Sequence, residues 1–225
     1  MITYHKIETV FNRDIEGTKK LIPYDWRDPT VEFLKNCTWE WTEKIDGTNI
    51  GVYWDGHKVS FQGRTEKAQI PKFLLEKLEE LFGGEENEQI FEQMFGEKEV
   101  VLFGEGYGNK IQKCGAKYIP NGVDFILFDV WVNGIYLERV NVLNIAMAFH
   151  VNVVPIVGKG TILEAIKYVQ TKPKSRIGNA MSEGVVARPT TEIKNRKGER
   201  VIVKIKAHDF EGVDCGTDMV GGDTE

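Results

Sequence analysis

The stretch Glu43-Lys44-Ile45-Asp46-Gly47-Thr48-Asn49 decides how this sequence is interpreted, because it places a lysine in a turn after the apolar residues 37–42. Alternating apolar and polar residues on both sides predict two strands that flank this turn. A lysine in a Lys-x-Asp-Gly sequence at a strand end can attack the α-phosphate of a nucleotide as a covalent nucleophile. A solvated turn, with Gly47 supplying a positive φ, explains the same residues. The motif alone leaves both interpretations open.

Composition limits the class of protein. The chain has 225 residues, of which 41% are hydrophobic, so one large or two small domains with a sizeable core are expected. No apolar run approaches the roughly 18 residues of a membrane span, and the N-terminus lacks the pattern of a signal peptide. Three distant cysteines without C-x-x-C spacing favour a reducing compartment over a disulfide framework or a zinc site. We therefore expect a cytoplasmic protein, or one in the host cytoplasm if a phage encodes it.

The net charge of −5 is unevenly distributed along the chain. Residues 76–99 hold nine acids and two lysines, which leaves −7 there and about +2 for the remainder. We interpret this acidic stretch as a solvated helix face. By contrast, six cations fall within thirteen positions: Lys194, Arg196, Lys197, Arg200, Lys204 and Lys206. A polyanion can therefore still bind at one face of the protein.

Hydrophobic periodicity predicts an α+β fold, in which mostly antiparallel hairpins are wrapped by helices. Asp55-Gly56 is typical of a hairpin turn, and Gly83-Gly84 of a helix end. The expected helices are 71–82, 88–95, 138–150 and 162–170. The expected later strands are 99–103, 124–131, 151–157, 184–187 and 201–205.

One predicted strand carries an aromatic residue of interest. In Asp124-Phe125-Ile126-Leu127-Phe128-Asp129, a period of two places Ile126 and Phe128 on one face and Leu127 and Asp129 on the other. An aromatic ring there can stack on a purine, although most strand phenylalanines simply belong to the core.

Two acids and a lysine pair add to the motif at Lys44. Glu105, between two glycines after a strand, can accept a hydrogen bond from a ribose hydroxyl or be an ordinary turn residue. Glu183 precedes an apolar strand, and Mg²⁺ needs few protein carboxylates beside phosphate oxygens. Lys204 and Lys206 share one strand face, where they either meet solvent or clamp a triphosphate.

The motifs, in the order in which they occur along the chain, resemble those of the covalent nucleotidyltransferase superfamily, which comprises DNA ligases, RNA ligases and messenger-RNA capping enzymes. Within this superfamily they resemble phage-type ATP-dependent RNA ligases most. The likeness spans residues 39–206. It rests on residues 43–49, Gly63-Arg64-Thr65, Glu183-Gly184-Val185 and Lys204-Ile205-Lys206. The resemblance implies a ligase-type, ATP-grasp-like nucleotidyltransferase domain of antiparallel sheets flanked by helices.

The resemblance also implies a role for each matching residue. Lys44 is the expected nucleophile, assisted by Lys204 and Lys206, with ATP as AMP donor and Mg²⁺ or Mn²⁺ as cofactor. Glu43 would read the adenine amino group, Arg64 the ribose and the substrate 5′-phosphate. Glu105 would contact the ribose, and Phe128 would stack on adenine. The expected nucleotide-binding residues are Glu43, Ile45, Asn49, Arg64, Glu105, Phe128, Glu183, Lys204 and Lys206, and the expected metal ligands are Glu183 and Asp46.

We expect an N-terminal segment, residues 1–37, packed on a nucleotidyltransferase domain, residues 38–210, with a flexible tail at 211–225. Relatives carry a further OB-fold or helical domain, for which the residues after Lys206 are too few. The expected activity is ATP-dependent sealing of RNA 5′-phosphate and 3′-hydroxyl ends in RNA repair. DNA ligase, capping guanylyltransferase, and a non-catalytic nucleotide or RNA-end binder are the alternatives.

Overall fold

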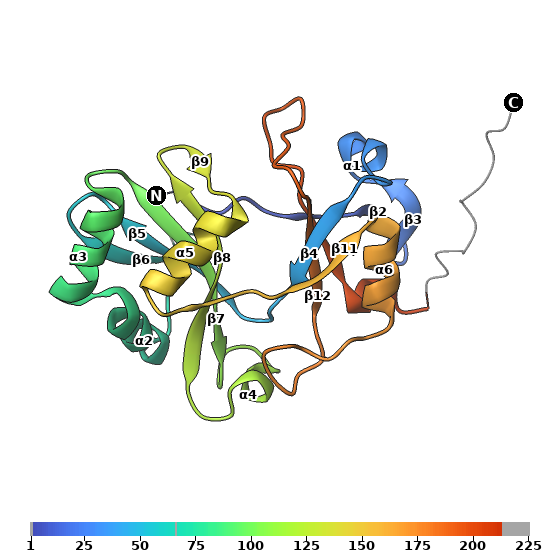
Figure 1. Ribbon diagram of the computed structural model, residues 1–225. Coiled ribbons are helices and arrows are strands. Elements are labelled where there is room, and N and C mark those ends of the chain that lie inside the picture. The colour runs from blue at the N-terminus through green and yellow to red at the C-terminus, as the bar shows by residue number, and fades with distance from the viewer. Residues whose placement is uncertain (1, 66, 213–225) are drawn as a thin grey trace, which may run out of the picture. The chain divides into compact units, whose positions relative to one another are not determined.

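The computed structural model describes residues 2–65 and 67–212 (Figure 1). The chain forms two compact units. Unit 1 comprises Met1–Lys6, Glu43–Pro155 and Lys174–Met181, and unit 2 comprises Ile7–Thr42, Ile156–Pro173 and Ser182–Glu225. The segment predicted as one N-terminal piece thus divides between the units after Lys6. Most of the predicted tail, residues 213–225, lies outside the described residues.

Unit 1 contains a sheet in which β10, β8, β7, β5 and β6 are neighbours in that order, and β9 also pairs with β8. The β10–β8 pair is parallel and the other pairs are antiparallel. The strands are β5 (Thr48–Trp54), β6 (Val59–Gly63), β7 (Val100–Gly108), β8 (Val123–Val132), β9 (Ile135–Tyr136) and β10 (Asn152–Val153).

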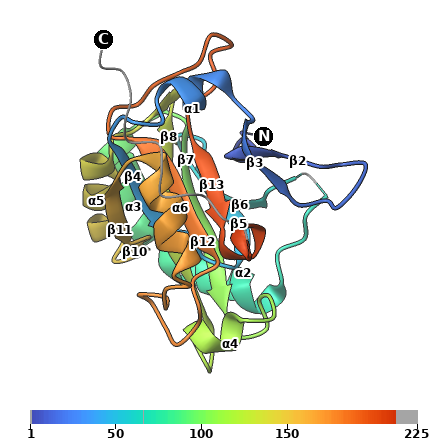
Figure 2. The ribbon, with the colours of Figure 1, turned by 90° about the vertical axis from the view of Figure 1, so that its right-hand side faces the viewer.

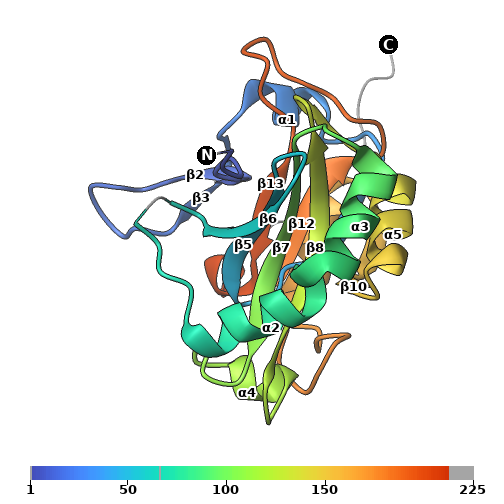
Figure 3. The same ribbon diagram turned by 90° about the vertical axis from the view of Figure 1, so that its left-hand side faces the viewer.

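Three helices cover one face of this sheet: α2 (Lys72–Phe82), α3 (Gly84–Phe95) and α5 (Arg139–Ala148) (Figure 3). Their apolar residues pack against alternate residues of the strands, such as Leu102 and Phe125. Because successive side chains of a strand point to opposite faces, the residues between them lie on the other face. We call this the motif face of unit 1, defined by Asn49, Glu105 and Ile126, which are register partners on β5, β7 and β8. The short helix α4 (Gly115–Tyr118) follows β7.

Unit 2 contains a second sheet, in the order β1-β13-β12-β4-β11, and the separate hairpin β2-β3. Its strands are β1 (Glu8–Thr9), β2 (Phe11–Arg13), β3 (Leu21–Trp26), β4 (Trp39–Glu43), β11 (Ile156–Gly160), β12 (Gly184–Pro189) and β13 (Val203–Lys206). Its helices are α1 (Pro29–Phe33), α6 (Ile162–Gln170) and the 3₁₀ helix η1 (Ala207–Phe210).

Helix α6 covers one face of this second sheet (Figure 2). Trp39, Trp41, Val185 and Ile205 are buried in the core that α6 joins. The alternate residues of β13, Lys204 and Lys206, therefore lie on the opposite face, which we call the motif face of unit 2. Both sheets thus bury one face under helices and carry predicted functional residues on the other.

The prediction of antiparallel sheets flanked by helices is confirmed, and several boundaries need correction. The expected helix at 88–95 begins at Gly84, directly after Gly83 ends α2. The expected strand 151–157 is two strands, β10 and β11, in different sheets. Pro155 lies between them and has no N–H to donate to a ladder. No sequence pattern predicted β1, β2, β3, α1 or α4, which are short or irregular. None of the helices within the described residues is long and apolar enough to cross a membrane.

Candidate active site

The Lys44 turn connects β4 to β5, and hydrogen bonds fix the residues that follow the lysine. Ile45 is buried in a cluster that includes Tyr107. The Asp46 N–H donates a long hydrogen bond of 3.4 Å to the Tyr118 hydroxyl. The Gln112 side chain donates to the Gly47 carbonyl at 3.0 Å. The backbone after Lys44 is therefore held by a buried side chain and by residues far along the chain.

Gly47 is required for close approach rather than for its φ. A Cβ at this position would lie 2.4 Å from the Gly106 carbonyl oxygen and 2.6 Å from Cγ of Glu105. Gly47 does not occur among the glycines with positive φ, so the interpretation as a positive-φ turn residue is wrong. The expected hairpin glycine, Gly56, does have a positive φ of 99°. Gly47 thus lets the Lys44 turn run directly against β7 at Glu105.

A row of register partners crosses the motif face of unit 1 beside this turn. Asn49 pairs with Glu105, and Glu105 pairs with Ile126. Arg64 is exposed immediately after β6, at the end of the sheet where Asn49 lies, because the preceding Gly63 pairs with Ile50. The structure therefore brings Asn49 and Glu105 together, although they are distant in sequence.

A β-bulge in β8 changes which residues reach the motif face. The register shifts between Phe103, which pairs with Asp129, and Gly104, which pairs with Leu127. Phe128 is the extra residue of this bulge, so Asp129 shares a face with Phe103. The prediction that Asp129 lies with Leu127 on the opposite face from Phe128 is therefore wrong, because the bulge interrupts strict alternation.

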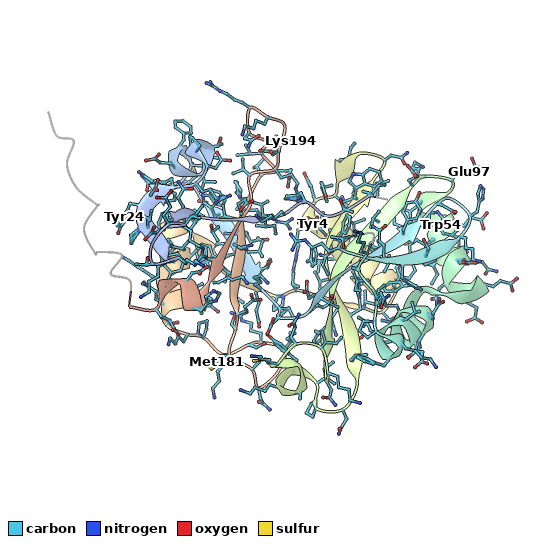
Figure 4. The ribbon with its side chains drawn as sticks, turned by 180° about the vertical axis from the view of Figure 1, so that it is seen from behind. Tyr4, Tyr24, Trp54, Glu97, Met181 and Lys194 are labelled. Carbon is cyan, nitrogen blue, oxygen red and sulfur yellow. The ribbon has the colours of Figure 1, made fainter. Side chains whose placement is uncertain are left out.

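Tyr4 lies on this face and makes contacts that the sequence did not predict (Figure 4). Its ring centroid lies 5.0 Å from that of Phe128 and 5.0 Å from that of Phe103. Its hydroxyl donates to the buried carboxylate of Asp129 at 2.9 Å. A single tyrosine near the N-terminus gives no sequence signal for contacts 125 positions away.

Glu43 presents a buried acceptor beside the lysine. The residue is 2% exposed, and its Oε2 accepts a hydrogen bond from the Arg176 N–H at 2.9 Å. Its Oε1 has no hydrogen-bond partner among the described residues. A buried carboxylate oxygen without a donor costs free energy, so this atom is suited to receive a donor from a ligand.

In the buried cluster that contains Ile45, burial and then the charge of Asp124 raise the pKa of Tyr107 to about 12. The Tyr107 hydroxyl therefore stays protonated at neutral pH and supplies a donor rather than a charge. Tyr107 follows Glu105 by two positions and shares its face of β7.

In unit 2, the structure brings together Glu183 and Lys206. Their carboxylate and ammonium groups form an ion pair of 2.6 Å, with side chains 17% and 27% exposed. Gly184 pairs with Lys206 in the ladder, and a Cβ on Gly184 would lie 2.0 Å from the Ile205 carbonyl oxygen. The glycine therefore permits the close strand contact that places Glu183 beside β13. Lys204 and Lys206 share a face, as predicted.

The chemistry of these groups suits a hard cation held by few protein ligands. No group of three or more His, Cys, Asp or Glu residues that could hold a metal occurs within residues 2–65 and 67–212. Of the two predicted metal ligands, Glu183 lies in unit 2 and Asp46 in unit 1. Mg²⁺ is usually bound by one or two carboxylates together with waters and substrate phosphates, so a single carboxylate such as that of Glu183 is sufficient.

Comparisons with known proteins identify the class to which this fold and these motifs belong. Residues 38–206 match the model of the RNA ligase family. The chain belongs to the RNA ligase family, which confirms the resemblance to covalent nucleotidyltransferases of the RNA ligase type. No curated protein matches the chain by sequence.

Solved structures of RNA ligases from Naegleria gruberi share the fold. A lysine-to-alanine variant with ATP and Mn has a TM-score of 0.63 and 19% identity over 91% of this chain and 62% of that chain. A variant of RNA ligase R4a without ligand has a TM-score of 0.62 and 20% identity over 81% of this chain and 53% of that one. The ligase with PPi has a TM-score of 0.59 and 21% identity over 93% and 64%. The chain therefore spans less than two thirds of the length of these proteins.

Proposed function

We propose that this protein is an ATP-dependent RNA ligase that joins 5′-phosphate and 3′-hydroxyl ends through a lysyl-AMP intermediate at Lys44, in RNA repair. The proposal includes an ATP-grasp-like nucleotidyltransferase domain. Family membership over residues 38–206 supports the reaction class. ATP and a divalent metal ion, Mg²⁺ or Mn²⁺, are the cofactors, in keeping with the Naegleria gruberi ligase structure with ATP and Mn.

The main support for this proposal is Oε1 of Glu43, the residue before Lys44, because this atom has no hydrogen-bond partner among the described residues. Adenine offers an exocyclic amino group that donates hydrogen bonds, whereas guanine has a carbonyl oxygen at the same ring position. A buried acceptor without a partner among the described residues would therefore favour adenine. This observation favours ATP over GTP and so a ligase over a capping guanylyltransferase.

The proposed reaction has three steps. The neutral Lys44 amine attacks the α-phosphorus of ATP, forming an N–P bond, losing a proton and releasing pyrophosphate. A 5′-phosphate oxygen of RNA attacks the same phosphorus and displaces the lysine amine, leaving a 5′–5′ pyrophosphate linkage. A 3′-hydroxyl attacks the RNA 5′-phosphorus, loses its proton and releases AMP, which closes the phosphodiester bond.

The remaining predicted residues hold the reactants in this proposal. Glu105 and Asn49 contact the ribose, Phe128 stacks on the adenine, and Tyr4 positions Phe128. Arg64 receives the 5′-phosphate of the RNA.

Cationic groups complete the proposed machinery. Lys204 and Lys206 stabilise the charge that develops on phosphate oxygens. Glu183 would hold the divalent ion, which neutralises charge on the phosphates of ATP when bound. Asp46, in unit 1, is proposed separately as a metal ligand.

Intact-mass spectrometry after incubation with ATP and Mg²⁺ tests the first step. Wild type is expected to gain the mass of one AMP group, and Lys44→Ala to gain none. Lys58→Ala, which changes another lysine of unit 1, is expected to behave like wild type. A mass gain of one GMP group from GTP, without a gain of AMP from ATP, would contradict the ligase assignment. Parallel sealing assays with RNA and DNA ends distinguish an RNA ligase from a DNA ligase.

A further inference from the structure

The segment between β12 and β13 is a hairpin that extends beyond the strands of its sheet (Figure 1). Lys194 pairs with Arg200, and the Val201 N–H donates to the Ile193 carbonyl at 2.9 Å. A turn at the tip is closed by the Gly198 N–H, which donates to the Asn195 carbonyl at 2.9 Å. We call residues 192–201 the basic hairpin.

The structure sorts the six clustered cations of this region into two groups. Arg200 is buried, and its guanidinium pairs with both carboxylate oxygens of Glu192 at 2.5 and 3.0 Å. Lys206 is paired with Glu183, and Lys204 is half-buried on β13. The other three cations of the basic hairpin are exposed: Lys194, Arg196 and Lys197. Figure 4 labels Lys194.

The tip is held in place by specific contacts. The Asn195 carboxamide oxygen accepts hydrogen bonds from the N–H groups of Lys197 and Glu199, each at 3.0 Å. Its amide donates to the Glu199 carboxylate at 2.9 Å and to Asp28, the N-cap of α1, at 3.3 Å. Ile193 packs against the buried core of unit 2. The cations are thus presented on a fixed turn, with Arg196 and Lys197 at its two central positions.

Two acids lie close to these cations and limit their net charge. The Glu199 carboxylate is already engaged by Asn195. Burial opposes ionisation of Asp28, but hydrogen bonds from Thr30 and Asn195 and the charge of Lys197 hold its pKa below the ordinary value. The basic hairpin therefore keeps a net positive charge, which contrasts with the net charge of −5 of the whole chain.

We infer that the basic hairpin is an RNA-binding surface, at which Lys194, Arg196 and Lys197 contact the phosphate backbone of the RNA strand. The inference rests on the proposed function for the identity of the polyanion. Phosphate contacts hold a nucleic acid in register without reading its sequence, which suits a ligase that acts on strand ends. Each neutralised phosphate releases counterions, so binding through this surface weakens as salt rises.

The test compares RNA affinity over a salt series by fluorescence anisotropy, with a 5′-phosphorylated single-stranded RNA as the probe. In the variant K194Q/R196Q/K197Q we expect the slope of log affinity against log salt to fall by about 2, since each phosphate contact of a single strand contributes roughly 0.7. The same variant is expected to lose about tenfold or more in affinity at low salt. Self-adenylation from ATP is expected to remain at the wild-type level.

A matched control removes the same number of charges elsewhere. Lys20, Lys58 and Lys167 are exposed, and K20Q/K58Q/K167Q is expected to retain most of the salt slope. The charge-retaining variant K194R/K197R is expected to bind like wild type. Thermal melting of each variant establishes that the fold is retained.

Equal slopes for the hairpin and control variants would overturn the inference, as would an absence of measurable RNA binding by wild type. If Lys44 gains no AMP while RNA binding still depends on the basic hairpin, the proposed function is wrong, but the inferred RNA-binding surface is retained. If Lys44 is adenylated and RNA binding is independent of the hairpin, only the surface fails.

Discussion

Among single residues, Glu43 is the one on which the proposed nucleotide choice depends, through its buried carboxylate. One of its oxygens is held by the Arg176 N–H, and the other has no partner among the described residues. The side chain is therefore fixed in orientation, while one acceptor is available to a ligand. A fixed acceptor discriminates between bases better than a mobile one, because mispairing leaves it buried and unsatisfied.

We predict that Glu43→Gln weakens the use of ATP in self-adenylation. Losing a charged acceptor to a ligand donor costs about 1.5–3 kcal/mol, which corresponds to roughly a 10- to 100-fold higher ATP concentration at half-maximal rate. The preference for ATP over GTP should also shrink. Rates of AMP and GMP transfer, measured over a concentration series, check both effects.

Glu40→Gln is the matched control, because Glu40 lies on the same strand β4 but pairs with Lys159 at 3.2 Å. It is expected to leave the ATP dependence unchanged. An equal loss in both variants would show that a general effect on β4, and not the Glu43 acceptor, sets the ATP dependence.

At the scale of elements, helix α6 supports the sheet that carries Lys204 and Lys206. Its buried residues, such as Ile166 and Val169, pack against the face opposite these lysines. Its N-terminus has a capping box, in which the Thr161 hydroxyl accepts from the Glu164 N–H at 3.2 Å and the Glu164 carboxylate accepts from the Thr161 N–H at 2.7 Å. The start of α6 is therefore set by local chemistry.

We predict that Thr161→Ala lowers the free energy of unfolding by about 1 kcal/mol at pH 7, because an N-terminal N–H loses its acceptor. Urea denaturation measures the change. Thr171→Ala, at the opposite end of α6, is the control. It should lower the free energy of unfolding less, since the Thr171 hydroxyl donates an exposed hydrogen bond to the Tyr168 carbonyl oxygen. A larger loss at Thr171 than at Thr161 would contradict the role of the capping box.

The capping box also gives a pH dependence with a defined sign. The hydrogen bond from the Thr161 backbone, followed by that from its side chain, lowers the pKa of Glu164 below the ordinary value of 4.5. A depressed folded-state pKa contributes stability above the unfolded value, and this stability is lost as pH falls through the folded-state pKa. Wild type is therefore expected to have a higher free energy of unfolding than Glu164→Gln above pH 4.5. This difference in the free energy of unfolding should become smaller as the pH falls below 4.5.

At the scale of the whole molecule, the two units divide the predicted machinery between them. The proposed nucleophile, Lys44, and the residues proposed to contact adenine and ribose belong to unit 1, whereas Glu183 and the lysine pair belong to unit 2. Asn49 and Glu105 lie on the motif face of unit 1, and Lys204 and Lys206 lie on the motif face of unit 2. Because a nucleotide is expected to bind the folded protein and not the unfolded chain, nucleotide binding should stabilise the folded protein.

We predict that ATP with Mg²⁺ raises the melting temperature, and that covalent transfer makes this gain persist. A ligand at 100 times its Kd stabilises by about 2.7 kcal/mol, which corresponds to about 5–10 °C for a chain of this size. After removal of free nucleotide by gel filtration, wild type should keep part of the gain and Lys44→Ala should lose all of it. Loss of the gain in both proteins would argue against a lysyl-AMP intermediate.

Several features follow from the amino-acid sequence alone: the order of the motifs, the hairpin through Gly56, most helices and the shared face of Lys204 and Lys206. These features depend on local periodicity and on residues close in the chain. The tertiary structure settled the features that depend on distant contacts: the close approach that requires Gly47, the pairing of Asn49 with Glu105, and the packing of Tyr4 on Phe128. It also decided which clustered cations are paired and which are exposed at the basic hairpin. The physical reason is that register, bulges and burial arise between residues far apart in sequence, whose contacts leave no periodic pattern.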